Sequence, residues 1–485
     1  MSDTVQRPAF DDPAEGVGAV SGKGWLIVIS DLHASEGDLE DFDQELEGHF
    51  VAFLDSFARR AEPTELVLNG DFLDFVQASP FFGSDLERTR EDGIPLCFTE
   101  AQSVEKFEAI QRAHPRMFTA LAAFLGARRE NRLVILPGNH DADFFWPDVR
   151  AKLCAAMCAA PGQVSFCLSR AYRPFSWLWI EHGHQHDPVN CFFVNGVERW
   201  SEERPPIFVG SVAGSGEADA RLYECTGTRF MIRFLNRLDA RFPYVDNVKP
   251  FSRFLRIFGA SALTPGWGPL DASLSVASMV SYLAGTLAGQ RSDLMSVRRP
   301  EQPAHPLATW LQTSTRSERQ ELVQRLRDCG FSSEMPLDMF AGRPADLERL
   351  AAFLLEHPEA VEDFGEKDPA LLGASSGTLT LRDGYNANET ESLYDAATSI
   401  ANREKVTTIV MGHTHEPVER TAGFVYINTG SWTRYFRYSD ADRTHPWRVL
   451  REKSYERFPY RLMYAMVPPG GSAATVEVWR ERLKT

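Results

Sequence analysis

The sequence predicts an α/β protein whose alternation of strands and helices is interrupted by a long insertion. Short apolar runs rich in branched side chains, such as residues 25–29 and 132–136, alternate with helical stretches. Glycine or polar residues end each run and stop the strand. Ligands of open α/β sheets bind beyond the carboxyl ends of the strands. The residues that follow each apolar run are therefore the candidates for function.

Composition indicates an ordinary globular protein that carries excess negative charge. The chain has 485 residues, of which 43% are hydrophobic, and a formal net charge of −16. That charge argues against nonspecific nucleic-acid binding, which needs a positive surface, and suits a site for cations. The seven cysteines are odd in number and form no Cys-x-x-Cys pair, so neither a disulfide framework nor a structural zinc site is expected.

The pattern along the chain predicts four segments. Residues 1–23 are rich in Asp, Gly, Pro and Ser and are expected to form a disordered tail, residues 24–190 and 389–485 the two parts of an α/β core, and residues 191–388 a mainly helical insertion or cap. The chain shows neither a signal peptide nor a run of about 20 apolar residues. A reduced, cytoplasmic protein is the expectation.

The insertion carries a basic stripe beside an aromatic one. Arginines recur every four residues over 229–242, Arg233 and Arg237 among them, next to Phe230 and Phe234. Three interpretations compete: a helix packed on the core, a lid over an anionic or acyl-bearing substrate, and peripheral attachment to the inner membrane.

The clearest motif follows the strand predicted over residues 133–136. Pro137 and Gly138 end the strand, and Asn139, His140 and Asp141 then lie at its carboxyl end. Taken alone, the tetrapeptide from Gly138 to Asp141 is better explained by an Asx-type turn with a surface histidine. Similar polar groups follow other strands, however, and this favours a common site.

Two further strands of the first part end in acidic and imidazole side chains. Asp31 and His33 follow residues 25–29, and an extended segment would point both side chains the same way. Asp71 follows the strand over residues 65–69. Asp74 is a weaker candidate, because a helix N-cap explains it equally well.

Histidines follow two strands near the insertion. The run predicted over 176–181 is followed by His182, His184 and His186, for which a histidine-rich surface loop is the alternative explanation. The run over 406–410 is followed by His413 and His415.

These strand ends together indicate a dinuclear metal centre. Mixed carboxylate and imidazole ligands suit Mn, Fe, Zn or Ni better than Mg or Ca. The ligands are too many for one ion, whereas two ions sharing a carboxylate, with Asp71 as the natural bridge, would use them all. Two ions that share a water would supply hydroxide near neutral pH for in-line attack on phosphorus.

At this point the chain resembles the calcineurin-like metallophosphoesterase superfamily. Five blocks carry the resemblance, in the family's order: Asp31-Leu32-His33, Gly70-Asp71, Gly138-Asn139-His140-Asp141, His182, and Gly412-His413-Thr414-His415. It covers roughly residues 24–190 and 389–485 and implies a four-layer α/β/β/α sandwich.

The resemblance also implies a role for each residue. One ion would take Asp31, His33, Asp71 and His415, and the other Asp71, Asn139, His182 and His413. His140 would contact the phosphate or act as general acid, with Asp141 orienting its ring. His182 is preferred as the ligand of the histidine run because it lies nearest the strand. The candidates for substrate contact are His184, His186, Asp187, Asn190, Arg233 and Arg237.

Within the superfamily, the phrase from Gly70 to Phe75 looks like the bacterial branch of UDP-2,3-diacylglucosamine pyrophosphohydrolases, which cover an acyl-bearing substrate with a helical insertion. This chain departs from that branch in having His140 where arginine is common, and in its far longer insertion. A manganese-dependent phosphoesterase acting on a small anionic or lipid-linked phosphate is the main hypothesis. The alternatives are a nuclease acting on DNA or RNA ends, and a non-enzymatic scaffold.

Overall fold

The computed structural model describes part of the chain: residues 22–36, 41–78, 99–187, 189–194, 197–211, 218–225, 227–228, 231–232, 247–249, 316–331, 389–437 and 458–480, with Asn236, Leu350 and Phe353. The chain divides into two compact units. The first comprises Met1–Asn247, Glu389–Phe436 and Ser454–Thr485, and the second Val248–Asn388 and Arg437–Lys453. Nearly all of the tail predicted over residues 1–23 lies outside the described residues.

One sheet of the first unit has six strands in the order β17-β16-β1-β2-β3-β4. Its parallel strands are β1 (Trp25–Ile29), β2 (Thr64–Asn69), β3 (Arg132–Leu136) and β4 (Val164–Phe166). β16 (Met463–Val467) is antiparallel to β1 and forms a hairpin with β17 (Thr475–Val478).

A second sheet has five strands in the order β13-β14-β12-β6-β5. The sequence predicted β6 (Leu178–Ile180) and β12 (Thr408–Met411), which are parallel to each other, and β12 is also parallel to β14 (Val425–Asn428). The sequence did not predict the antiparallel edge strands β5 (Tyr172–Phe175) and β13 (Val418–Thr421). Both are short, and the side chains of β13 are all partly or fully exposed, so neither gives an apolar run.

The α-helices in the described part of the first unit are α1 (Gln44–Ala58), α3 (Glu100–Ala113), α4 (Pro115–Ala127), α5 (Pro147–Ala156) and α15 (Glu389–Glu404). α1 begins at Asp43, whose carboxylate accepts hydrogen bonds from two backbone amides of the first turn. The segment from Glu100 to Ala127 forms two helices rather than one. Pro115 cannot donate the next hydrogen bond of α3, and it begins α4 instead.

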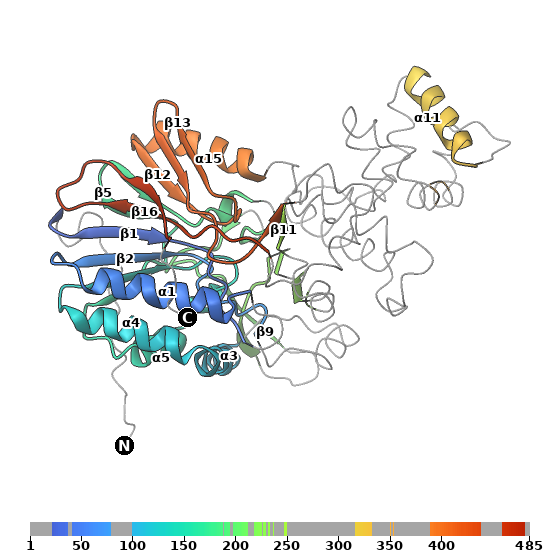
Figure 1. Ribbon diagram of the computed structural model, residues 1–485. Helices are drawn as coiled ribbons and strands as arrows, with labels where there is room; N and C mark the ends of the chain where they lie inside the picture. The colour runs from blue at the N-terminus through green and yellow to red at the C-terminus, as the bar shows by residue number, and fades with distance from the viewer. Residues whose placement is uncertain are drawn as a thin grey trace. The chain divides into compact units, whose positions relative to one another are not determined.

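Side chains that alternate along the strands form three apolar layers. Ile27 and Ile29 of β1 pack among the residues of α1, α3, α4 and α5, whereas Leu26 and Val28 face the second sheet. On the far face of the second sheet, Ile409 packs against α15. Figure 1 shows α1, α4 and α5 covering one sheet and α15 beside the other. This arrangement confirms the predicted α/β class with its α/β/β/α layers.

The start of the predicted insertion contains strands in its described part. β7 (Phe193–Val194) pairs with β8 (Val197–Glu198), and β9 (Ile207–Ser211) with β10 (Ala218–Leu222). The other described elements are β11 (Val248–Lys249), α11 (Arg316–Asp328) and β15 (Phe436–Arg437). Arg233, Arg237 and most of the basic stripe lie outside the described residues. Among the described helices, none has the length and apolar character that a membrane crossing requires.

Candidate metal centre

The predicted ligands lie in loops at the carboxyl ends of parallel strands from both sheets. β1, β2 and β3 lead to Asp31 and His33, to Asp71 and to Asn139, while β6 leads to His182 and β12 to His413 and His415. Hydrogen bonds join the sheets at this edge. The backbone N–H of His413 donates to both carboxylate oxygens of Asp31 at 3.2 and 3.1 Å, and Asn69 Nδ2 donates to the carbonyl of Glu181 at 3.0 Å.

Asp31, His33 and His415 form the first ligand group. Their nearest ligand atoms all lie within 4.8 Å of one another, and all three residues are buried. The two Nε2 atoms of His33 and His415 are 3.0 Å apart, and His415 Nε2 is 3.4 Å from Asp31 Oδ1. A carboxylate and two imidazoles at this spacing are a donor set for a divalent transition metal.

Asp71, His182 and His413 form the second ligand group, again with ligand atoms within 4.8 Å of one another. Asp71 Oδ2 lies 3.2 Å from His182 Nε2 and 3.7 Å from His33 Nε2, which belongs to the first group. The carboxylate of Asp71 thus stands between the two groups, where a bridging ligand would be needed.

Asn139 adds an acceptor that no other described residue satisfies. The residue is 5% exposed, and its Oδ1 is buried without a hydrogen-bond partner in the described part of the chain. Buried amide oxygens are nearly always paired, so an unpaired one at the end of β3 fits a cation ligand. Asn139 Nδ2 faces Asn190 Oδ1 at 3.5 Å, which leaves the oxygen to point elsewhere.

The backbone at the ligands is left-handed rather than extended. Asp31 and His33 have φ of 57° and 51°, so the alternation expected of an extended Asp-x-His segment is not how these side chains meet. Asp71, His413 and His415 also have positive φ, at 49°, 71° and 58°. Five of the seven non-glycine residues with positive φ in the described part of the chain are predicted ligands. Such strain gathers at functional sites.

Three glycines allow the loops to approach one another closely. A Cβ atom at Gly138 would overlap the carboxylate of Asp71, and one at Gly412 would overlap Asp31. At Gly70, with φ of 84°, a Cβ atom would overlap the ring of His182. Each glycine therefore precedes a ligand in its own loop and makes room for a ligand from another loop.

Charges of opposite sign shift the pKa values of buried carboxylates and histidines in the site. Burial alone would raise the pKa of Asp71, but the charges of His182, His140 and His33 hold that pKa well below its ordinary value. Burial alone would lower the pKa of His182, whereas the charges of Asp71 and Asp31 raise it to about 9. The carboxylates therefore favour positive charge at this edge, as a cation site must.

Asp74 has the role that was expected of Asp141, because it is the carboxylate that orients the His140 ring. Its Oδ2 accepts a hydrogen bond from His140 Nδ1 at 2.7 Å and another from His33 Nδ1 at 2.9 Å. Its Oδ1 accepts from the backbone amides of Val76 and Gln77, each at 2.9 Å, but residues 75–77 form a turn rather than the start of a helix. The spacing of three residues from Asp71 was the available signal. One carboxylate thus orients a predicted ligand and the neighbouring His140.

Asp141 instead binds the backbone of two loops. Its carboxylate accepts hydrogen bonds from the amides of Gly138, of Asp71 at 3.3 Å and of Phe72 at 2.8 Å. Burial, followed by the charge of Asp71, raises the pKa of Asp141 to about 8. The side chain therefore holds the loops after β2 and β3 together rather than the ring of His140.

The candidates for substrate contact differ in where they lie. His184 and His186 form the short 3₁₀ turn η4 (His184–His186). The ring of His184 is buried against Trp200, and His186 bonds Glu181, so both turn toward protein groups. Asp187 Oδ2 lies 3.0 Å from His413 Nε2 and accepts a hydrogen bond from Asn190 Nδ2 at 2.6 Å. Asp187 and Asn190 therefore back the second ligand group.

The sandwich gathers carboxylates and imidazoles, which are donors for a divalent transition metal, at the carboxyl ends of both sheets. In agreement, residues 24–241 match the family model of the calcineurin-like phosphoesterases. No curated protein matches the chain in a comparison of sequences. The match includes the strands from β1 to β6, and it indicates metal-dependent hydrolysis of phosphoric esters. His413 and His415 lie beyond the matched segment. They reach the site because β12, which precedes them, pairs with β6.

Proposed function

We propose that the protein is a phosphoric ester hydrolase that works with two divalent transition-metal ions, manganese being the first choice and iron, zinc or nickel the alternatives. The first ion would be held by Asp31, His33, Asp71 and His415, and the second by Asp71, Asn139, His182 and His413. The position of the Asp71 carboxylate between His33 and His182, at 3.7 and 3.2 Å, is the observation that carries the proposal.

The protein groups around the ions would bind and orient the substrate. When bound, two ions lower the pKa of a water that they share, so that it can attack phosphorus, and they neutralise charge on the phosphoryl oxygens. His140 adjoins the ligand Asn139, and Asp74 holds its ring by hydrogen bonding Nδ1. Its Nε2 edge would then contact the phosphate or give a proton to the leaving group.

We further propose a small anionic or lipid-linked phosphate as the substrate, whose reacting bond is a phosphomonoester, a phosphodiester or a pyrophosphate. The net charge of −16 disfavours a long polyanion. Asp187 and Asn190 would belong to the wall of the site. Asp187 contacts the predicted ligand His413, and Asn190 contacts the predicted ligand Asn139.

Metal analysis and a panel of substrates test this function. Purified full-length protein should hold about two transition-metal ions per chain and hydrolyse a para-nitrophenyl phosphodiester faster when Mn²⁺ is added. The panel also contains an aryl phosphomonoester, an acylated nucleotide sugar with a pyrophosphate bond, and DNA and RNA with free ends. Salt-sensitive degradation of nucleic acid alone would replace the substrate proposal by the nuclease. Protein that holds no transition metal and hydrolyses none of these would refute the function.

A further inference from the structure

One face of helix α3 places two buried polar side chains behind the metal centre. Ser103 and Lys106 are three residues apart, so they lie on the same face of the helix, and both are 0% exposed. The neighbouring buried side chains Phe107 and Ile110 belong to the apolar core. An amine is costly to bury in such surroundings, so its contacts should account for its presence.

The two side chains contact the loops after β2 and β3. Lys106 Nζ donates a hydrogen bond to the backbone carbonyl of Phe75 at 2.7 Å. Ser103 Oγ donates to Asp143, which lies in the 3₁₀ turn η3 (Ala142–Phe145) three residues after His140. The charge of Lys106 also interacts with those of Asp143 and Asp74. α3 therefore joins the loop that carries Asp71 and Asp74 to the loop that carries His140.

The peptide groups of Phe75 connect Lys106 with His140. Phe75 accepts from Lys106 through its carbonyl and donates its own N–H to the carbonyl of His140 at 3.1 Å. The residue before it, Asp74, bonds the ring of the same histidine at 2.7 Å. His140 is thus held at its backbone and at its ring by two consecutive residues, and Lys106 anchors the carbonyl of the second.

We propose that Lys106 is a positioning residue for the reaction: by binding the Phe75 carbonyl it holds the Asp74–Phe75 segment, and through that segment the ring of His140. The inference rests on the proposed function, because His140 matters only if the centre acts on a phosphate. Burial lowers the pKa of Lys106 to about 7, although Asp143 and Asp74 raise it, and the amine donates a hydrogen bond in either form.

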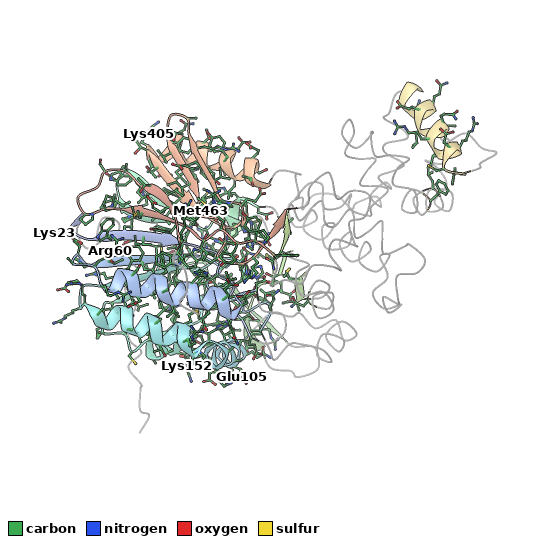
Figure 2. The ribbon with its side chains drawn as sticks, viewed as in Figure 1. Lys23, Arg60, Glu105, Lys152, Lys405 and Met463 are labelled. Carbon is green, nitrogen blue, oxygen red and sulfur yellow. The ribbon has the colours of Figure 1, made fainter. Side chains whose placement is uncertain are left out.

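The test replaces Lys106 in the full chain by methionine, which keeps the length of the side chain and removes the donor. K106M should lower kcat of Mn²⁺-dependent phosphodiester hydrolysis about tenfold or more, with KM changed less than about twofold and metal content unchanged. K152M is the matched control. Lys152 on α5 is exposed and pairs with Glu108, outside the loops of the site, and Figure 2 labels it at the outer side of the helices.

K106M alone removes the positive charge that balances the buried carboxylate of Asp143, and this can destabilise the fold. A double variant therefore separates positioning from charge balance. In K106M/D143N the uncompensated carboxylate is gone but the Phe75 carbonyl still lacks its donor. The thermal midpoint should recover, while kcat stays low. A double variant with wild-type kcat would show that Lys106 only balances Asp143, and it would overturn the proposal.

A second readout does not depend on hydrolysis. In the metal-free protein, the proton on His140 Nδ1 that is shared with Asp74 should give a downfield NMR signal, which H140Q identifies by its loss. That signal should shift or broaden in K106M and in the double variant, and stay unchanged in K152M. An unchanged signal in both Lys106 variants would overturn the inference whatever the activity. A wild type without hydrolysis would instead refute the proposed function and leave this comparison valid.

Discussion

The two ligand groups use similar side chains but are supported differently. In the first group, His33 is backed by the carboxylate of Asp74, which is fully buried in the loop after β2. In the second group, His182 Nδ1 is backed by the backbone carbonyl of Asn69 at 2.9 Å, and His413 by Asp187, whose side chain is 14% exposed.

This difference indicates that a core carboxylate orients His33 of the first group, whereas His413 of the second group depends on the segment after β6. Outer carboxylates fix the orientation and basicity of histidine ligands. We therefore expect the first ion to bind more tightly than the second. Four variants test this order of affinities: one changes the shared ligand, one changes a residue outside both sets, and two change the support of one set each.

The largest effect is expected for Asp71→Asn, which alters the one carboxylate that both groups share. Both ions should be lost or greatly weakened, and kcat/KM should fall by about a thousandfold or more, because charge stabilisation by both ions goes with them. Metal analysis and phosphodiester hydrolysis measure this. If the variant keeps one ion at wild-type affinity, Asp71 is not the bridge.

His140→Gln should leave both groups intact and lower turnover. The expected loss in kcat is about 10²–10⁴-fold, the range for a group that transfers a proton or binds the transition state. The metal content should equal that of the wild type, because the ring bonds Asp74 and belongs to neither assigned set of ligands. A variant that loses metal would make His140 a ligand instead.

Asp74→Asn should affect the first group and His140 together. Loss of the carboxylate that binds both rings should weaken the first ion about 10–100-fold and lower kcat as well. Titration with Mn²⁺ followed by activity separates the two effects. Asp148→Asn, an exposed change in the first turn of α5, serves as the control for the removal of a negative charge.

Asp187→Asn should give the smallest effect, because this carboxylate is partly exposed. The second ion should bind about tenfold more weakly, while the first keeps its affinity. Calorimetric titration of the metal-free protein should show the change in the weaker of two binding steps. A change in the tighter step would reverse the order of affinities inferred from the two groups.

The strands that carry the site were predictable because they are buried on both faces. β1, β2 and β3 are nearly continuous apolar runs, as parallel strands between two layers must be. The edge strands β5 and β13 gave no such signal, since Arg173 and the charged residues of β13 interrupt any apolar pattern. The positions of the ligands in the chain followed from the ends of the buried strands.

The finer geometry of the site could not be read from the sequence. The family resemblance implied Asp141 as the partner of the His140 ring, but the turn after β3 directs that carboxylate to the amides of Gly138, Asp71 and Phe72. The partner of the ring is Asp74, which lies in the loop after the neighbouring strand β2. Contacts between loops depend on which strands are neighbours, and one chain segment does not contain that information.

The place of Asp71 and His182 has a consequence for the stability of the whole sandwich. One residue follows a strand of the first sheet and the other a strand of the second, with 3.2 Å between their ligand atoms. A cation bound by both would cross-link the two halves of the core. Because a ligand of the folded state alone raises the free energy of unfolding with its concentration, a chelator should lower the melting temperature along with the activity.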